Sequence, residues 1–357
     1  MKTIIVTHRQ VPEDATVSGY ESTQTEAGQQ HTPGSRRFML VPGLPLLLAS
    51  ALFLLSSGCA PTAIDQEPIE ATSLLGEPLR RPTLDPSFSE KHTEFFVEAQ
   101  RRTETNPEDP DGWIWSGRRC AYLGRYQEAI EIYSRAMERF PADARFYRHR
   151  GHRYITVRDF ELAIVDLSKA AQLTAGSPDQ IEPDGLPNAR GIPTSTLQTN
   201  IQYHLGLAYF LSGEYANARR AYTRGLEAAT NPDMRSAMAY WLLLTIWRLN
   251  FEPDAEVLLS MIDPDWDIIE NEDYHGLLRE FAGDGDPLLR LESARSAGGV
   301  RFATVGFGVG AWQWHRGERE AALATWRDVI DGGSWASFGY IAAEAELARS
   351  ASRVDPE

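Results

Sequence analysis

Hydrophobic and polar residues divide the 357-residue chain into four kinds of segment. Residues 1–37 are polar and of mixed charge, residues 38–55 are almost entirely apolar, and residues 59–88 are rich in proline without a sustained period. From residue 89 to residue 350, apolar residues recur at the three- and four-residue spacing of amphipathic helices. The pattern predicts an all-α folded region that follows a cleaved signal and a disordered tether.

Within the folded region, pairs of helices repeat with a period of thirty-four residues. The first unit starts at Pro110 and the second at Ala144, and a third follows after an interruption. The characteristic residues are Trp113, Gly117, Gly124, Tyr126, Ala129, Tyr133, Ala136 and Pro141 in the first unit, Tyr147, Gly151, Tyr154, Phe160, Ala163, Leu167 and Ala170 in the second, and Gly206, Tyr209, Gly213, Tyr215, Ala218 and Tyr222 in the third. Small residues stand where two antiparallel helices must cross closely, and bulky residues fill the space between units. This pattern resembles the tetratricopeptide repeat.

The resemblance implies a right-handed superhelix of helix-turn-helix units, which must stack because one hairpin cannot cover its own apolar face. Phe95, Phe96 and Ala99 predict a leading helix before the first unit. The predicted divisions are 1–58 (extension and signal peptide), 59–88 (tether), 89–175 (leading helix and units 1 and 2), 176–198 (an inserted loop), 199–262 (unit 3 and a degenerate unit 4), 263–299 (an irregular helical segment) and 300–350 (a repeat-like hairpin and a capping helix). We expect the capping helix to turn alanine and glutamate outward.

The apolar run is followed by the tetrapeptide Ser56-Ser57-Gly58-Cys59. This order, an apolar segment followed by small residues and then a cysteine, resembles the lipobox of bacterial lipoproteins. The resemblance implies that the Cys59 thiol carries lipid and that the folded part lies in the periplasm, anchored to the cell envelope at the outer membrane. An uncleaved membrane anchor and a plain secretory signal are the alternatives, although early proline and glycine residues in the run favour a signal. Arg36 and Arg37 leave the export route, general or twin-arginine, open.

The net charge of −15 argues against one class of partner. The charges of residues 1–58 cancel, so the whole acidic excess belongs to the part after the signal. Nucleic-acid binding requires basic residues that displace counterions, and we therefore expect no nucleic-acid partner. The two cysteines are Cys59 and Cys120, and lipidation of the first leaves no intrachain disulfide. Cys120 is predicted to pack in the core.

Motifs for catalysis or ligand binding are weak. Residues 306–311 imitate a dinucleotide-binding glycine loop, but the same glycines fit the small-residue face of a repeat helix. Three alternating aspartates in residues 263–267 lack the glycine that a calcium loop requires. Three helical histidines lack the acids and cysteines of a metal site: His149, His152 and His204. With no nucleophile motif either, we expect no enzyme activity, no catalytic residue, no metal and no cofactor.

A concave groove is the predicted binding site. The resemblance implies that the first helix of each unit lines it, through Ile114, Arg118, Tyr122, Arg145, Arg148, His152, Ile155, Asn200, Tyr203, Leu207 and Phe210. Arg145, Arg148 and His152 form one stripe along a helix, which makes the groove locally basic and suited to a peptide with an acidic residue or a free C-terminus. Arg148 is expected to be solvent-accessible. A merely solvated basic helix is the alternative interpretation of this stripe.

Together these patterns predict a lipid-anchored scaffold or adaptor that binds protein partners in the bacterial envelope. The membrane is contacted through the N-terminal lipid alone. An envelope hydrolase or a sugar-binding protein, with its site in residues 176–198 or 263–299, is the alternative.

Overall fold

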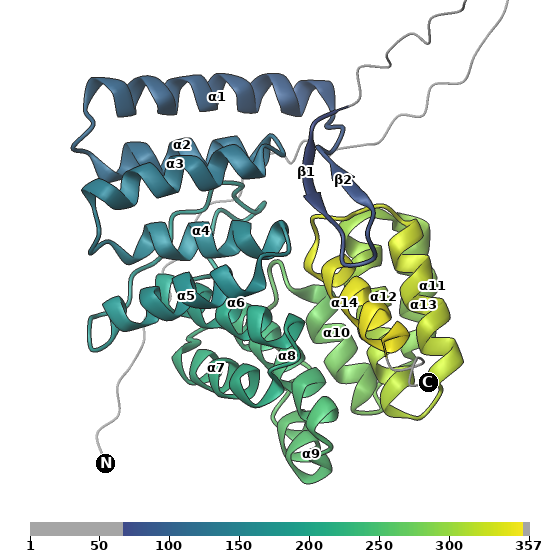
Figure 1. Ribbon diagram of the computed structural model, residues 1–357. Helices are drawn as coiled ribbons and strands as arrows, with labels where there is room; N and C mark the ends of the chain where they lie inside the picture. The colour runs from purple at the N-terminus through teal and green to yellow at the C-terminus, as the bar shows by residue number, and fades with distance from the viewer. Residues whose placement is uncertain (1–66, 353–357) are drawn as a thin grey trace, which may run out of the picture. The chain divides into compact units, whose positions relative to one another are not determined.

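The structure is a computed structural model, which describes residues 67–352 (Figure 1). Its strands are β1 (Ile69–Thr72) and β2 (Pro78–Arg80). Its helices are α1 (Pro86–Thr105), α2 (Pro110–Tyr122), α3 (Tyr126–Arg139), α4 (Ala144–Thr156), α5 (Phe160–Thr174), α6 (Leu197–Leu211), α7 (Tyr215–Ala228), α8 (Pro232–Leu249), α9 (Glu252–Ser260), α10 (Glu272–Phe281), α11 (Pro287–Ala297), α12 (Gly299–His315), α13 (Arg319–Asp331) and α14 (Phe338–Ala351). None of the helices in this range is long and apolar enough to cross a membrane. The signal segment and Cys59 lie outside the described residues.

Local sequence explains where the helices of the first two units begin and turn. Asp109 and Asp143 cap α2 and α4, because each carboxylate accepts a backbone N–H of the first turn. Pro110, with its fixed φ angle, occupies the first helical position of α2. Gly124 has φ +72° in the turn between α2 and α3, a conformation that glycine adopts without a steric penalty.

Close crossings within each pair of helices confirm the assigned register. A Cβ atom on Gly117 of α2 would lie 2.3 Å from the Tyr133 ring of α3, so only glycine allows this approach. Gly151 of α4 meets Leu167 of α5 in the same way, with a distance of 2.7 Å to its Cγ. The small and bulky positions were predicted from the repeat, whereas the contact of Tyr133 and Leu167 with the glycine of their own pair was not, since bulky residues were expected to fill the space between units.

The helices from α1 to α8 pack in chain order, each against the next, and bury a continuous apolar core (Figure 1). The predicted all-α solenoid is therefore confirmed. Residues 175–196 contain no helix, as the interruption of the repeat predicted, and their one isolated bridge joins Ile181 to Thr196. Helices α10 and α11 occupy the segment that was predicted to be irregular and helical.

Part of the predicted tether is folded, which corrects its boundary at residue 88. Strands β1 and β2 form an antiparallel hairpin, and α1 begins at Pro86. The Glu70 carboxylate is buried, pairs with Arg81 at 2.7 Å and accepts the backbone N–H of Gln127 at 3.0 Å. The hairpin is thereby attached to the start of α3. Short strands separated by prolines gave too little alternation to predict it.

The capping helix differs from expectation in the direction of its glutamates. Helix α14 packs against α12, α13 and α6, and Glu344 and Glu346 are buried rather than turned outward. Arg158 Nη2 lies 2.6 Å from Glu344 Oε2, and Glu344 also accepts the backbone N–H of Leu74 from the hairpin. The C-terminal helix thus contacts both the second repeat and the segment before the first helix.

Arg158 stands at a position where the other units use glycine. Its φ angle is +72°, close to that of Gly124 and Gly213 in the equivalent turns. A side chain in this left-handed region costs roughly 1–2 kcal/mol. Such strain persists where surrounding contacts fix the residue, and the buried ion pair with Glu344 is that contact.

Candidate functional site

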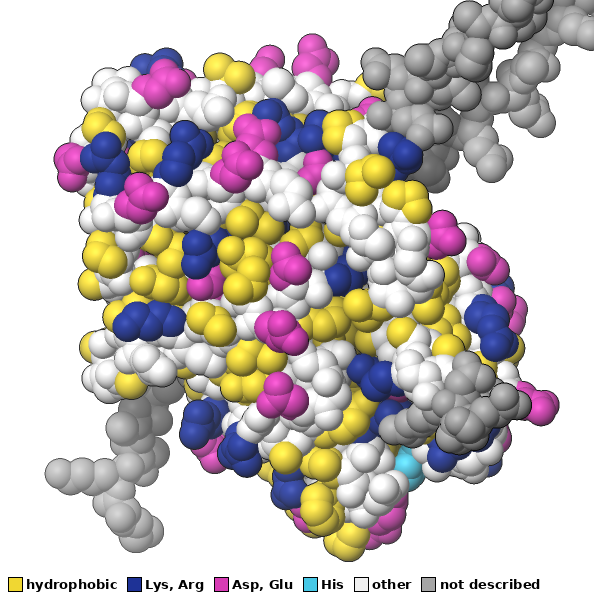
Figure 2. Space-filling model, viewed as in Figure 1, with side chains coloured by type: hydrophobic (Ala, Val, Ile, Leu, Met, Phe, Trp, Pro, Cys, Tyr) yellow, Lys and Arg dark blue, Asp and Glu magenta, His cyan; other side chains and the backbone are white. Residues whose placement is uncertain are grey.

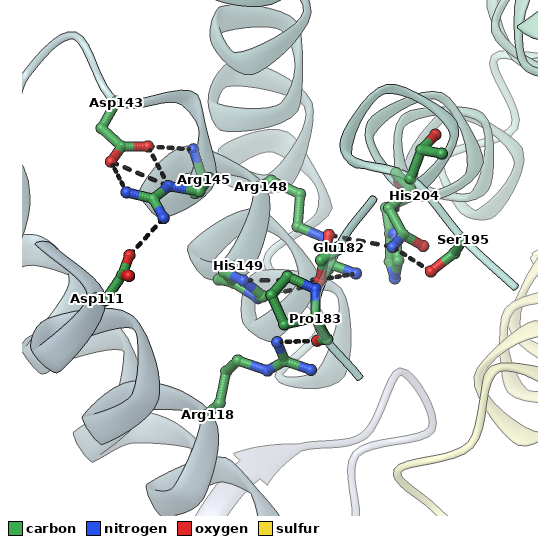
Figure 3. Close-up of polar contacts among 12 residues, drawn as sticks. Asp111, Arg118, Asp143, Arg145, Arg148, His149, Glu182, Pro183, Ser195 and His204 are labelled. Atoms are coloured by element: carbon green, nitrogen blue, oxygen red, sulfur yellow. Dashed lines mark hydrogen bonds and ion pairs between the residues drawn. The ribbon is translucent and has the colours of Figure 1, made fainter. Parts of the chain in front are cut away.

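The inserted loop lies against the first helices of the repeat units, α2, α4 and α6 (Figure 3). Its Glu182 carboxylate lies 3.0 Å from Arg148 Nη2 of α4 and accepts a 3.1 Å hydrogen bond from Asn200 Nδ2 of α6. The Arg148 and Glu182 side chains are each only 9% exposed, so the ion pair is buried. Water and salt screen a buried pair of this kind much less than an exposed one.

The loop backbone is bound as well as the Glu182 side chain. Arg118 Nη1 donates a 2.6 Å hydrogen bond to the carbonyl of Pro183, and Arg119 Nη1 donates one of 3.0 Å to the carbonyl of Gly185. Both guanidinium groups lie over the Trp115 ring, at 4.6 and 4.8 Å from its centroid. This stacking orients the two guanidinium groups toward the loop.

Gly185 is required where the loop passes α2. A Cβ atom at this residue would lie 2.1 Å from the hydroxyl of Tyr122. Tyr122, one of the residues predicted to line the groove, contacts the loop by close approach of the backbone. Its hydroxyl also accepts a 3.3 Å hydrogen bond from Arg118 Nη2.

The expected solvent exposure of Arg148 was wrong. Arg148 is buried because the loop covers it, and Nη1 contacts His149 Nδ1 at 3.0 Å. Burial lowers the pKa of the Arg148 guanidinium, and the Glu182 carboxylate opposes that effect. Sequence periodicity did not reveal that the chain itself supplies the counterion of Arg148.

The basic stripe predicted along α4 does not act as one surface. Arg145 turns away from Glu182 and pairs with Asp143 and Asp111, each at 2.6 Å, which hold its pKa above the ordinary value (Figure 3). Its side chain holds the capping residue Asp143 and joins the start of α4 to α2. The alternative of a freely solvated basic helix also fails, since Arg145 and Arg148 are both paired with carboxylates.

Three histidines gather beside the ion pair. His152 and His204 have ring centroids 4.3 Å apart, and Phe338 from the start of α14 lies 5.2 Å from His152. Desolvation and the neighbouring arginines lower the pKa values of His149, His152 and His204 well below the ordinary value. These rings are neutral at pH 7. No group of three possible metal ligands comes together within residues 67–352.

The remaining predicted groove residues are in the core. Tyr203 and Phe210 are 8% and 1% exposed, and Ile114, Ile155 and Leu207 are also buried. The Tyr203 hydroxyl lies 3.0 Å from that of Tyr274 and accepts a hydrogen bond from Trp241 Nε1. Helices α10, α12 and α14 pack against this part of the array, so the part of α6 from Tyr203 onward does not line an open groove.

Residues 263–271 hold the other side of the loop. Asp267 pairs with Arg190 at 2.7 Å, and Glu270 accepts hydrogen bonds from Asn188 and Thr194. Asp233, at the start of α8, accepts the backbone N–H groups of residues 269–271 and fixes that turn. The acidic turn noted in the sequence therefore binds side chains of the inserted loop and helps to fix its position.

Sequence reasoning missed Glu182 and Arg119. Glu182 lies in the inserted loop, whose length suggested a function, but nothing in the local pattern indicates which charged residue turns inward. Arg119 occupies a position outside the expected groove set. Only the folded loop brings its carbonyl acceptor within reach.

Comparison with known proteins supports the repeat assignment. Residues 110–153 and residues 199–232 each match a tetratricopeptide repeat family model. Curated proteins give no match. Among solved structures, the chain is similar to YrrB, described as a TPR protein with an unusual peptide-binding site, with a TM-score of 0.38, 15% identity and coverage of 71% of this chain and 97% of that one. It is also similar to MamA AMB-1, with a TM-score of 0.36, 14% identity and coverage of 49% and 90%.

The chain thus carries tetratricopeptide repeats within an all-α solenoid. Such repeats are protein-interaction modules, and neither family model is that of an enzyme. These findings support a scaffold or adaptor with protein partners.

Proposed function

We propose that this chain is a lipid-anchored scaffold of the bacterial cell envelope, which binds acidic peptide segments of partner proteins in the groove formed by α2, α4 and α6. The inserted loop occupies the peptide site in the free protein. A partner segment binds by taking the place of residues 182–185.

The contacts of the loop carry this proposal. Glu182 is held by a guanidinium and an amide, and the carbonyls of Pro183 and Gly185 are each held by a further guanidinium. One carboxylate and two backbone acceptors in sequence are features of any extended peptide with an acidic residue. The guanidinium groups of the groove can therefore bind the carboxylate and the backbone carbonyls of another peptide in the same way.

The inserted loop is held mainly by polar contacts, which favours its displacement by a partner. The loop buries a charge, while Ile181, Leu186 and Ile192 are 68%, 49% and 45% exposed. Burial of apolar area, which is the main source of stability, therefore contributes little to holding it in place. A partner peptide that supplies the same carboxylate and also apolar contacts to the groove rim competes with it.

A direct test uses a labelled synthetic peptide with the sequence of residues 180–187, which is the probe, and the purified full chain. Glu182→Gln weakens the hold of the resident loop and leaves Arg148 without its counterion. Loss of a charge-assisted hydrogen bond of about 1.5–3 kcal/mol should raise the affinity for the probe roughly tenfold to hundredfold. Fluorescence anisotropy measures the change.

Matched controls separate this site from bulk electrostatics. Asp184→Asn removes the same charge from the same loop, but within residues 67–352 the Asp184 carboxylate bonds only the backbone N–H of Leu186, so affinity for the probe should be unchanged. Arg135→Glu on the exposed face of α3 should also have little effect. The proposal fails if Glu182→Gln and Asp184→Asn bind the probe alike, or if a probe with Gln in place of Glu binds equally well.

The anchor is supported by the sequence around Cys59 and is tested separately. Cys59→Ala should abolish labelling with radioactive palmitate and move the exported protein from the membrane fraction to the soluble periplasmic fraction. A variant that stays in the membrane and retains Met1 would instead establish the uncleaved anchor.

A further inference from the structure

The position of Gly185 in the inserted loop restricts which peptides can take the place of that loop. Gly185 is buried against the end of α2. A Cβ atom added to it would overlap the hydroxyl oxygen of Tyr122, and would lie 2.9 Å from Tyr122 Cζ and 3.0 Å from Arg118 Nη2. Atoms that are not bonded to each other prefer separations of about 3.5–4.0 Å. Any side chain at this position therefore collides with the tyrosine.

The need for glycine comes from the lack of space and not from the backbone conformation. Gly185 does not have the positive φ angle that disfavours other residues. Replacement of glycine by alanine also reduces the conformational freedom of an unbound chain, which favours the ordered state where the backbone is compatible. A loss of binding on this replacement therefore measures the collision with Tyr122.

Tyr122 is held in place where it meets the loop. Its hydroxyl accepts a 3.3 Å hydrogen bond from Arg118 Nη2, and the Arg119 guanidinium lies 5.6 Å from the centroid of its ring. The buried His92 ring of α1 contacts the tyrosine ring nearly at right angles, with centroids 5.6 Å apart. A movement of Tyr122 that made room for a Cβ atom would disturb contacts with both α1 and α2.

The guanidinium groups beside the loop bind its main chain. On the face of the molecule drawn in Figure 2, basic side chains over α1 to α3 lie next to acidic ones. Arg118 and Arg119 instead donate hydrogen bonds of 2.6 and 3.0 Å to the carbonyls of Pro183 and Gly185. Every residue has a backbone carbonyl, so these bonds fix the path of a bound peptide without selecting its sequence.

The side chains of the two middle residues are also not selected by the groove. Pro183 is exposed and is bound through its carbonyl. Asp184 accepts the backbone N–H of Leu186, which belongs to the loop itself. Only the first residue, Glu182 with its bound carboxylate, and the fourth, Gly185, meet the groove in a way that depends on the side chain.

We propose that the groove selects partner segments with the motif Glu-x-x-Gly, where x is any residue, and that Tyr122 is the residue that requires the glycine. This inference rests on the proposed function, because a partner segment must follow the path of residues 182–185. The glutamate binds Arg148 and Asn200, and the glycine passes Tyr122. A segment with the same glutamate and a side chain at the fourth residue is rejected.

Fluorescence anisotropy with labelled peptides of residues 180–187 tests the motif. The receptor is the full chain with Glu182→Gln, in which the hold of the resident loop is weakened. A probe with Gly185→Ala should bind about tenfold or more weakly than the unsubstituted probe, because overpacking is costly at a rigid contact. A probe with Asp184→Ala, changed one residue earlier, is the matched control and should bind within about twofold of the unsubstituted probe.

Receptor variants test the residue assigned to this selection. Tyr122→Phe removes the hydroxyl and leaves Cζ, so the difference between the Gly and Ala probes should shrink. Tyr122→Ala removes the ring, and the two probes should then bind within about twofold of each other. Tyr147→Ala should preserve the full difference, since the Tyr147 hydroxyl bonds the Pro141 carbonyl at the start of α4. Melting temperatures establish that each receptor is folded, and Tyr122→Phe tests the assignment even if Tyr122→Ala unfolds.

The outcomes separate the motif from the proposed function. If the unsubstituted probe binds and needs its glutamate, but the Gly185→Ala probe binds equally well, the peptide site stands and the motif is wrong. If Gly185→Ala weakens binding equally in the receptors with and without the Tyr122 substitutions, Tyr122 is not the selecting residue. If the unsubstituted probe does not bind, or a probe with Gln in place of Glu binds equally well, the proposed function fails and the motif fails with it.

Discussion

Glu344 is the residue whose replacement should be most informative about stability. Its side chain is fully buried, pairs with Arg158 at 2.6 Å and accepts the backbone N–H of Leu74. Glu344→Gln keeps the size and removes the charge, which leaves Arg158 buried without a counterion. Breaking a buried pair in this way costs about 3–5 kcal/mol.

The expected change in melting temperature follows from that free energy. A folded part of more than 250 residues shifts by about 2 °C per kcal/mol, so Glu344→Gln should melt roughly 6–10 °C below the wild type. Differential scanning calorimetry measures this shift. Hydrogen exchange at the amide of Leu74 should accelerate as well, because the hairpin loses its charged acceptor.

Two further variants decide whether the buried pair is the cause. Glu98→Gln breaks the exposed pair with Arg101, in which both side chains are more than 60% exposed, and should change stability by less than about 1 kcal/mol. Arg158→Met combined with Glu344→Leu removes both charges and should recover most of the loss. The reasoning is refuted if Glu344→Gln and Glu98→Gln melt alike, or if the double variant is no more stable than Glu344→Gln.

Two other predictions concern packing and pH. Gly151→Leu should cost about 1–3 kcal/mol or more through overpacking against Leu167, and an unchanged urea midpoint would contradict the repeat register. The folded state holds His149 and His204 neutral, so protons bind preferentially to the unfolded chain as pH falls below its histidine pKa of 6.5. Stability should therefore fall by up to about 3 kcal/mol per pH unit below that value. His204→Gln should make urea unfolding less steeply dependent on pH, and an unchanged slope would exclude this cause.

The repeat could be predicted because its signal lies in small and bulky residues at fixed spacing. Gly117 and Tyr133, or Gly151 and Leu167, belong to one hairpin, so their contact is determined by local sequence. The interruption after residue 175 was equally clear, because prolines and glycines forbid a continuous helix. These features fix the helices and the position of the loop.

The contacts of the groove could not be predicted because they join segments distant in sequence. The pattern placed Arg148 on the inner face of α4, but the identity of its partner depends on how the loop folds back. Glu344 was expected to face outward because the hairpin that covers it was not predicted. Periodicity shows which face of a helix is apolar, and it does not show which charged residues on different elements meet.

The contact between α14 and the early part of the chain has a consequence for how this protein evolves. An open array tolerates the gain or loss of a whole unit, since each unit contacts only its neighbours. Here an additional helix pair between Arg158 and Glu344 would displace α14 by about 8–10 Å for each added helix layer and separate the two charges. Insertion of a repeat unit between these residues would therefore break the buried Arg158–Glu344 pair. We expect length variation among descendants of this chain to be confined to its loops.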